Sequence, residues 1–138
     1  MSRWTCPQCD REFGRANQSH TCVPGGTVAD TFSGRPAGQL EAYQHIMAHL
    51  ATVGPVHVDS VQVGVFLKSD RKFAELRPMS RALSVNLQMS RSIADARVIR
   101  TQRITAEQYL NVVRVTDPDQ VDEVLCGWFT EAYDEATD

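Results

Sequence analysis

The sequence predicts an α+β protein in which an N-terminal zinc knuckle precedes a helix, an antiparallel β-sheet of about five strands and a C-terminal helix. Three observations predict this class. Cysteine and histidine cluster near the start, apolar residues then recur at helical spacing, and apolar and polar residues alternate before a second helical pattern. The predicted segments are a knuckle over residues 1–24, a linker over 25–38 and an α+β domain over 39–138.

The knuckle is predicted from a C-x-x-C…H-x-C pattern. Three thiolates and one imidazole at this spacing complete the tetrahedral shell of one structural Zn²⁺ and leave no coordination position open for a substrate. A disulfide would need an oxidising compartment, but no signal peptide opens the chain, and a redox C-x-x-C would need a preceding strand. We therefore expect a cytoplasmic protein with one zinc ion. The predicted ligands are Cys6, Cys9, His20 and Cys22.

Proline and glycine at positions 24–26 separate this knuckle from the rest of the chain. Phe32 is the one large apolar residue of the linker, and we expect it to pack on the domain. From Gln39 onward, apolar residues recur every three or four positions until Gly54 and Pro55, which predicts an amphipathic helix. Its expected apolar stripe consists of Leu40, Tyr43, Met47 and Leu50, with Ile46 and Val53 alongside.

The apolar period then falls to two, as in half-buried strands. The clearest strand is 83–89, where four apolar residues alternate with polar ones. The connections between strands are short, which favours antiparallel pairing. The other segments expected in strands are 56–58, 61–67, 71–77, 97–104 and 108–115.

The last element is a helix with a marked N-terminal signature. Asp117 is the expected N-cap, Pro118 suits the first helical position, and Gln120 completes a capping box. We expect Trp128 to be buried against the sheet. The predicted apolar stripe is Val121, Val124, Leu125, Trp128 and Ala132.

Charge is distributed unevenly, although the formal net charge is only −3. Residues 60–114 carry ten basic and four acidic groups, whereas residues 115–138 carry eight acidic and no basic groups. A basic middle segment can make phosphate contacts, so a nucleic-acid surface is one interpretation. A protein adaptor that uses the knuckle or an uncovered sheet face is the other. The candidate contact residues are Arg11, Arg15, Lys68, Arg71, Lys72, Arg77, Arg81 and Arg97.

The chain resembles a bacterial family of uncharacterised proteins in which a Cys/His knuckle precedes a domain of unknown function. The domain of that family also occurs attached to nuclease-like modules. The resemblance implies zinc on the four ligands named above, an α+β fold and an association with nucleic-acid systems. The stretches that carry it are residues 4–9, 13, 17–22, 68–75, 83–87 and 128–133.

The sequence does not favour an enzyme, but it leaves that question open. The glycines at positions 25 and 26 lack the Lys and Ser/Thr of a phosphate-binding loop. No pair of carboxylates precedes Lys68 closely enough to predict a nuclease-type metal site. No apolar run reaches the length of about 20 residues that a membrane span needs, so we expect no membrane association. The sequence indicates no oligomeric state.

Overall fold

The computed structural model describes residues 4–5, 12–13, 28–61 and 64–138 of the chain. The predicted zinc ligands Cys6, Cys9, His20 and Cys22 lie outside these residues. At the N-terminus, two short strands pair antiparallel, with Trp4 opposite Phe13. They are β1 (Trp4–Thr5) and β2 (Glu12–Phe13).

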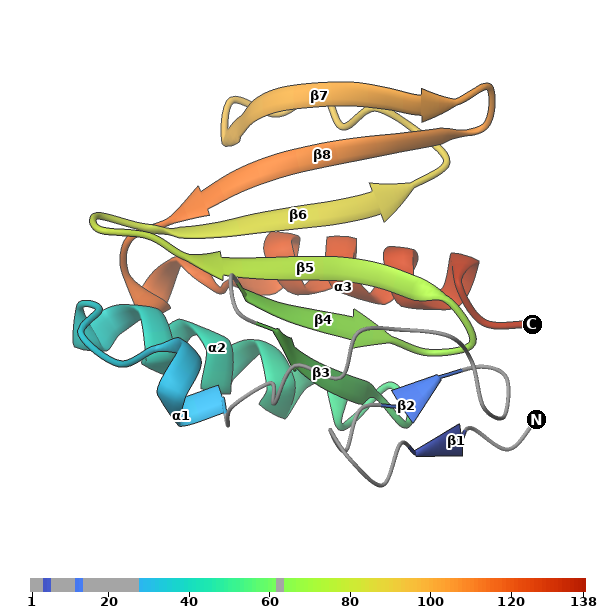
Figure 1. The fold of residues 1–138 in the computed structure, drawn as a ribbon. Helices are drawn as coiled ribbons and strands as arrows, with labels where there is room; N and C mark the ends of the chain where they lie inside the picture. Colours follow the sequence, from blue (N-terminus) through green and yellow to red (C-terminus); the bar gives the residue numbers. More distant parts are fainter. Residues whose placement is uncertain (1–3, 6–11, 14–27, 62–63) are drawn as a thin grey trace.

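Six strands form one antiparallel sheet in the order β3-β4-β5-β6-β8-β7, so the prediction of about five strands is one strand short (Figure 1). The first two strands form an antiparallel hairpin over residues 57–68, where the sequence predicts strand segments at 56–58 and 61–67. The strands are β3 (His57–Val61), β4 (Gly64–Lys68), β5 (Lys72–Pro78), β6 (Leu83–Met89), β7 (Val98–Thr105) and β8 (Gln108–Val115).

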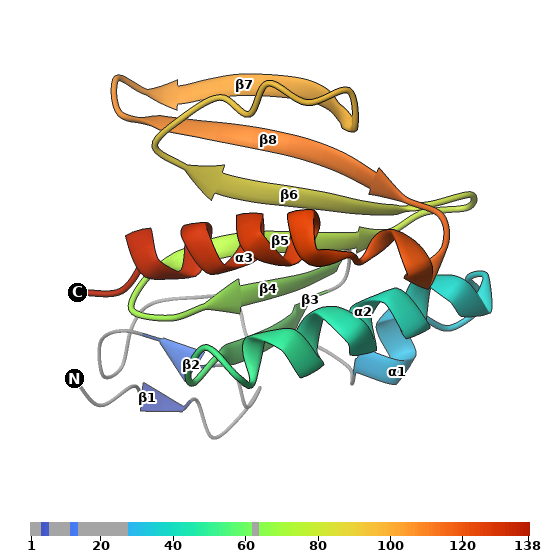
Figure 2. The same ribbon diagram turned by 180° about the vertical axis from the view of Figure 1, so that it is seen from behind.

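The two long helices, α2 (Ala37–Leu50) and α3 (Glu123–Glu135), cover the same face of this sheet, as Figure 2 shows. The short helix α1 (Val28–Thr31) lies near β3 and β4. The described helices leave the opposite face largely uncovered over β5, β6, β8 and β7. We call this the open face, and Figure 1 is seen from its side.

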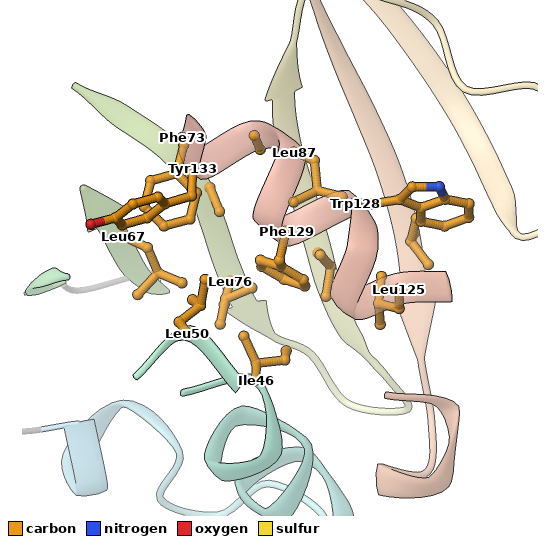
Figure 3. Close-up of a cluster of buried hydrophobic side chains, with 14 of the residues drawn as sticks. Ile46, Leu50, Leu67, Phe73, Leu76, Leu87, Leu125, Trp128, Phe129 and Tyr133 are labelled. Carbon is orange, nitrogen blue, oxygen red and sulfur yellow. The ribbon is translucent and has the colours of Figure 1, made fainter. Parts of the chain in front are cut away.

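The core lies between the helix pair and the sheet (Figure 3). Because side chains alternate along a strand, Val85 and Leu87 of β6 point into this core, whereas Ser84 and Asn86 point to the open face. Burying this apolar layer is the main driving force for the fold. The layer includes Ile46, Leu50, Leu67, Phe73, Leu76, Leu125, Phe129 and Tyr133.

The expected packing of Phe32 and Trp128 is confirmed, because both side chains are buried. Phe32 lies against the ring of Tyr43 at a centroid distance of 5.4 Å. The predicted stripe of α2 is partly wrong, since its most buried side chains are Gln39, Ala42, Ile46 and Leu50, while Leu40, Tyr43 and Met47 are half-buried.

The start of the last helix also differs from the prediction. The capping box of Asp117 and Gln120 is present, but it begins a 3₁₀ turn, η1 (Pro118–Gln120). α3 starts anew after a second N-cap, Asp122, whose side chain accepts a hydrogen bond from Leu125 N. This break turns the helix, so that Val124 is 50% exposed and Phe129 and Tyr133 face the core instead.

The link from β6 to β7 passes the end of β8, because β8 lies between these two strands. Asn111 of β8 is fully buried and fixes this link. Its Oδ1 accepts a hydrogen bond from Ile93 N at 3.0 Å, and its Nδ2 donates to Arg91 O at 3.0 Å. A single amide thus satisfies two backbone groups of an irregular segment.

Candidate functional site

A groove of about 720 Å³ runs over the open face of the sheet across β5, β6, β8 and β7. The strand register determines which side chains line it. In one row across the sheet, Arg77 lies opposite Ser84, and Ser84 lies opposite Arg114. In the next row, Glu75 lies opposite Asn86, followed by Val112 and Arg100.

The floor of the groove is polar where β6 crosses it. Ser84 and Asn86 are each only 8% exposed, although both side chains point away from the apolar core. The Ser84 hydroxyl donates a long hydrogen bond of 3.4 Å to Asn86 Oδ1. Among the described residues, no acceptor is within hydrogen-bonding distance of the Asn86 amide nitrogen. This buried donor is therefore available to a ligand.

The groove is rich in positive charge. Four arginines line it, namely Arg35, Arg77, Arg100 and Arg114, and Glu75 is the only acidic residue among the described lining residues. Glu75 already accepts a hydrogen bond from Arg77 Nε at 2.5 Å, with Lys72 Nζ at 3.8 Å. Its charge is therefore largely compensated. The groove consequently favours an anionic ligand.

The arginine side chains of the groove differ in how many of their hydrogen-bond donors are already used within the protein. Arg100 donates to Gln102 Oε1 at 2.9 Å, and Arg77 uses only its Nε in the pair with Glu75. Within the described part of the chain, Arg35 and Arg114 make no side-chain hydrogen bond or ion pair. Most of the guanidinium donors in the groove are thus free to bind anions.

Of the basic residues named from the sequence, Lys68, Lys72 and Arg77 project from the open face. Lys68 pairs with the buried Asp59 at 2.5 Å, and the Lys72 ammonium lies 4.5 Å from the centre of the Phe66 ring. Lys68 and Lys72 lie opposite each other beside the β4–β5 turn, at the other end of β5 from Arg77.

Arg71 and Arg97 contact the helical side instead. Arg71 donates to Asp138 and to the carbonyl of Glu135, and Arg97 pairs with Asp122 and stacks on the Trp128 ring at 5.1 Å. Arg81 lies in the turn between β5 and β6. The structure therefore does not bring all the predicted basic residues onto one surface. Arg11 and Arg15 lie outside the described residues.

Sequence reasoning missed Arg35, Arg114, Ser84 and Asn86 as site residues, and it counted Arg100 only toward overall charge. The signal that could have found them is the alternation in strands 83–89 and 108–115. Once Val85 and Val113 are assigned to the core, the residues beside them, Ser84 and Arg114, must share the other face.

Residues 28–136 match the family DUF5655, which is described as a domain of unknown function. This chain belongs to that family. No curated protein and no solved structure matches this chain. The DUF5655 match begins after the Cys/His cluster, so it covers the α+β domain and not the predicted zinc ligands.

Two further features of the described residues concern membranes and metals. Among the described residues, no helix is long and apolar enough to cross a membrane. In the same part of the chain, no group of three or more His, Cys, Asp or Glu side chains lies close enough together to hold a metal ion.

The DUF5655 domain contains one cysteine, Cys126, on α3. Burial raises the pKa of its thiol above the ordinary value, and the nearby Asp122 carboxylate raises it further. Cys126 is thus protonated at neutral pH and a poor nucleophile, because thiolates are the reactive form.

Proposed function

We propose that this protein is a non-catalytic, zinc-containing nucleic-acid-binding protein whose open sheet face contacts phosphates. The observation that carries the proposal is the groove in which four arginines face a single, already paired carboxylate. Positive charge with free guanidinium donors is the main requirement for binding a phosphate backbone.

The zinc ion belongs to the proposal through the knuckle. Cys6, Cys9, His20 and Cys22 provide the Cys₃His donor set of a closed structural site. The pairing of β1 with β2 supports it, since β1 ends directly before Cys6 and β2 begins three residues after Cys9. The ion would stabilise the knuckle and take part in no reaction. A cytoplasmic location would keep these thiols reduced.

The second candidate function is a protein-protein adaptor with the same structural zinc. The specific observation in its favour is the edge strand β7, where Ile99 and Ile104 are 52% and 45% exposed. An unpaired strand edge flanked by apolar side chains can add a strand from a partner. The separation of Arg71 and Arg97 from the groove also favours the adaptor over a broad basic surface.

A mobility-shift titration at two salt concentrations separates the two functions. The probes are single-stranded DNA, duplex DNA and RNA, each with the full-length protein. Nucleic-acid binding predicts an affinity that falls steeply with salt, because neutralised phosphates release counterions. An adaptor predicts no complex even at low salt, which would lead us to discard the nucleic-acid function.

A further inference from the structure

We infer that Arg77, Ser84 and Arg114, together with Asn86, form a phosphate-binding site for the backbone of a single-stranded nucleic acid. This inference rests on the proposed function and specifies where the phosphate is bound. We call these four residues the phosphate site. They lie on the open face, on β5, β6 and β8.

The strand register places two arginines on either side of one hydroxyl. Ser84 is the direct cross-strand neighbour of both Arg77 and Arg114. Adjacent strands are about 4.8 Å apart, so the two arginine backbones are separated by about 10 Å. Side chains as long as arginine can converge across that distance on one anion above Ser84.

The floor of the site contains donors that the fold itself does not use. The residue Asn86 is 8% exposed, and its amide nitrogen donates no hydrogen bond among the described residues. Leaving a buried donor without a partner destabilises the fold, and a bound acceptor removes this penalty. A phosphate oxygen held over Ser84 can accept a hydrogen bond from this amide and from the Ser84 hydroxyl, whose present bond of 3.4 Å is long.

The neighbouring carboxylate does not oppose an anion here. Glu75 is engaged by Arg77 Nε, which leaves both Nη groups of Arg77 free. The carboxylate therefore fixes the orientation of the arginine, and the guanidinium edge that carries the Nη groups can bind phosphate in a bidentate manner. Arg114 needs no such support because it has no competing partner in the described part of the chain.

The low exposure of the groove donors favours a single strand. Ser84 and Asn86 line the groove and are each only 8% exposed, so a flexible single strand can bring a phosphate to them more easily than the regular backbone of a duplex. Arg100 lies one strand beyond β8 and can hold a second phosphate of the same chain. The groove floor beside it is formed by Leu110 and Val112, and no aromatic ring belongs to the described lining. Binding would therefore be through the backbone and independent of base sequence.

The test uses ¹⁵N-labelled full-length protein titrated with inorganic phosphate and, separately, with a short oligothymidylate. We expect saturable shifts at the Ser84 and Asn86 amides and at the Asn86 side-chain NH₂ with both probes. The variants are Arg77→Gln and Arg114→Gln. The matched control is Arg91→Gln, which removes the same charge from the pair with Glu131 on the helical side. Cooperative denaturation of each variant confirms that it is folded.

Each groove variant should weaken oligothymidylate binding about tenfold and reduce the log–log salt slope by about 0.7, the value for one phosphate contact on a single strand. The control should stay within about twofold of the wild type. Shifts spread evenly over all arginines, or an equal loss in Arg91→Gln, would overturn the phosphate site.

Other outcomes separate this inference from the proposed function. If oligothymidylate binds the wild type and both groove variants equally, the phosphate site is wrong and nucleic-acid binding stands. If phosphate shifts Ser84 and Asn86 but no nucleic acid binds, the site serves a small phosphorylated compound, and the nucleic-acid assignment is wrong. If neither probe binds, both fail.

Discussion

Replacing Asn111 by leucine tests whether one buried amide holds the β6–β7 link in place. The leucine side chain has a similar volume, but it lacks the oxygen that accepts from Ile93 N and the nitrogen that donates to Arg91 O. Ile93 is buried, so its N–H would lose its partner away from water, at about 1–3 kcal/mol. The Arg91 carbonyl belongs to an exposed residue and adds less, since water can reach it.

We therefore expect Asn111→Leu to lower the free energy of unfolding by about 2–4 kcal/mol. In a domain of this size that loss corresponds to a Tm lower by about 10 °C. Chemical denaturation measures the free energy, and hydrogen exchange of the Ile93 amide reports on the link directly. The Ile93 amide should exchange far faster than the amides of β4 and β5.

The matched control is Thr101→Val, which removes the third and longest hydrogen bond to Asn111, donated at 3.3 Å by the hydroxyl of an exposed residue. It should cost less than about 0.5 kcal/mol. An Asn111→Leu protein that melts within about 2 °C of the wild type, with Ile93 still protected, would refute the reasoning.

Four further predictions concern other parts of the chain. Trp128→Ala should cost about 3 kcal/mol in denaturant titrations, because it empties a buried aromatic position; an unchanged midpoint would contradict the packing. The pKa of Asp122 is lowered by its hydrogen bond from the Leu125 amide and by Arg97, so its stabilisation is present above about pH 4 and lost as the pH falls through the folded value. Asp122→Ala should accordingly cost about 1 kcal/mol at pH 7 and flatten the acid limb of a stability–pH curve. Gly64→Ala should destabilise the domain by about 1–3 kcal/mol, because the new Cβ would lie 2.5 Å from the Leu76 carbonyl oxygen. An unchanged Tm would contradict this close contact between β4 and β5. Metal analysis should find about one zinc per chain, and Cys6→Ala should lose the metal while the domain still unfolds cooperatively.

The elements of the fold were predictable from the sequence where one periodicity dominates. Strand β6 is the clearest case, since its apolar residues alternate without interruption from Leu83 to Met89. Helix α2 was predicted, but its buried face was predicted only in part. Gln39 belongs to that face because its side chain hydrogen-bonds to the backbone of Met79, and a pattern of apolar residues does not include a glutamine. A buried glutamine with backbone partners far along the chain leaves no local signal.

The order of the last three strands could not be predicted either. The short connection between the strands at 83–89 and 97–104 suggests that these two strands are neighbours in the sheet. In the structure, β8 lies between β6 and β7. The candidate site depends on this order, because it is β8 and not β7 that brings Arg114 beside Ser84. The sequence contains the arginines, but only the pairing of strands distant in sequence determines which of them share a face.

The insertion of β8 between β6 and β7 also governs the way in which the chain reaches its native state during synthesis. The outer edge of β6 remains unpaired until residues 108–115 have been made, and the apolar side chains of Leu125 and Phe129 arrive later still. An incomplete chain would expose the apolar face and the free edge of β6 together, a combination prone to aggregation. We therefore expect the domain to fold only when nearly complete, and truncation within α3 to yield insoluble protein rather than a smaller folded unit.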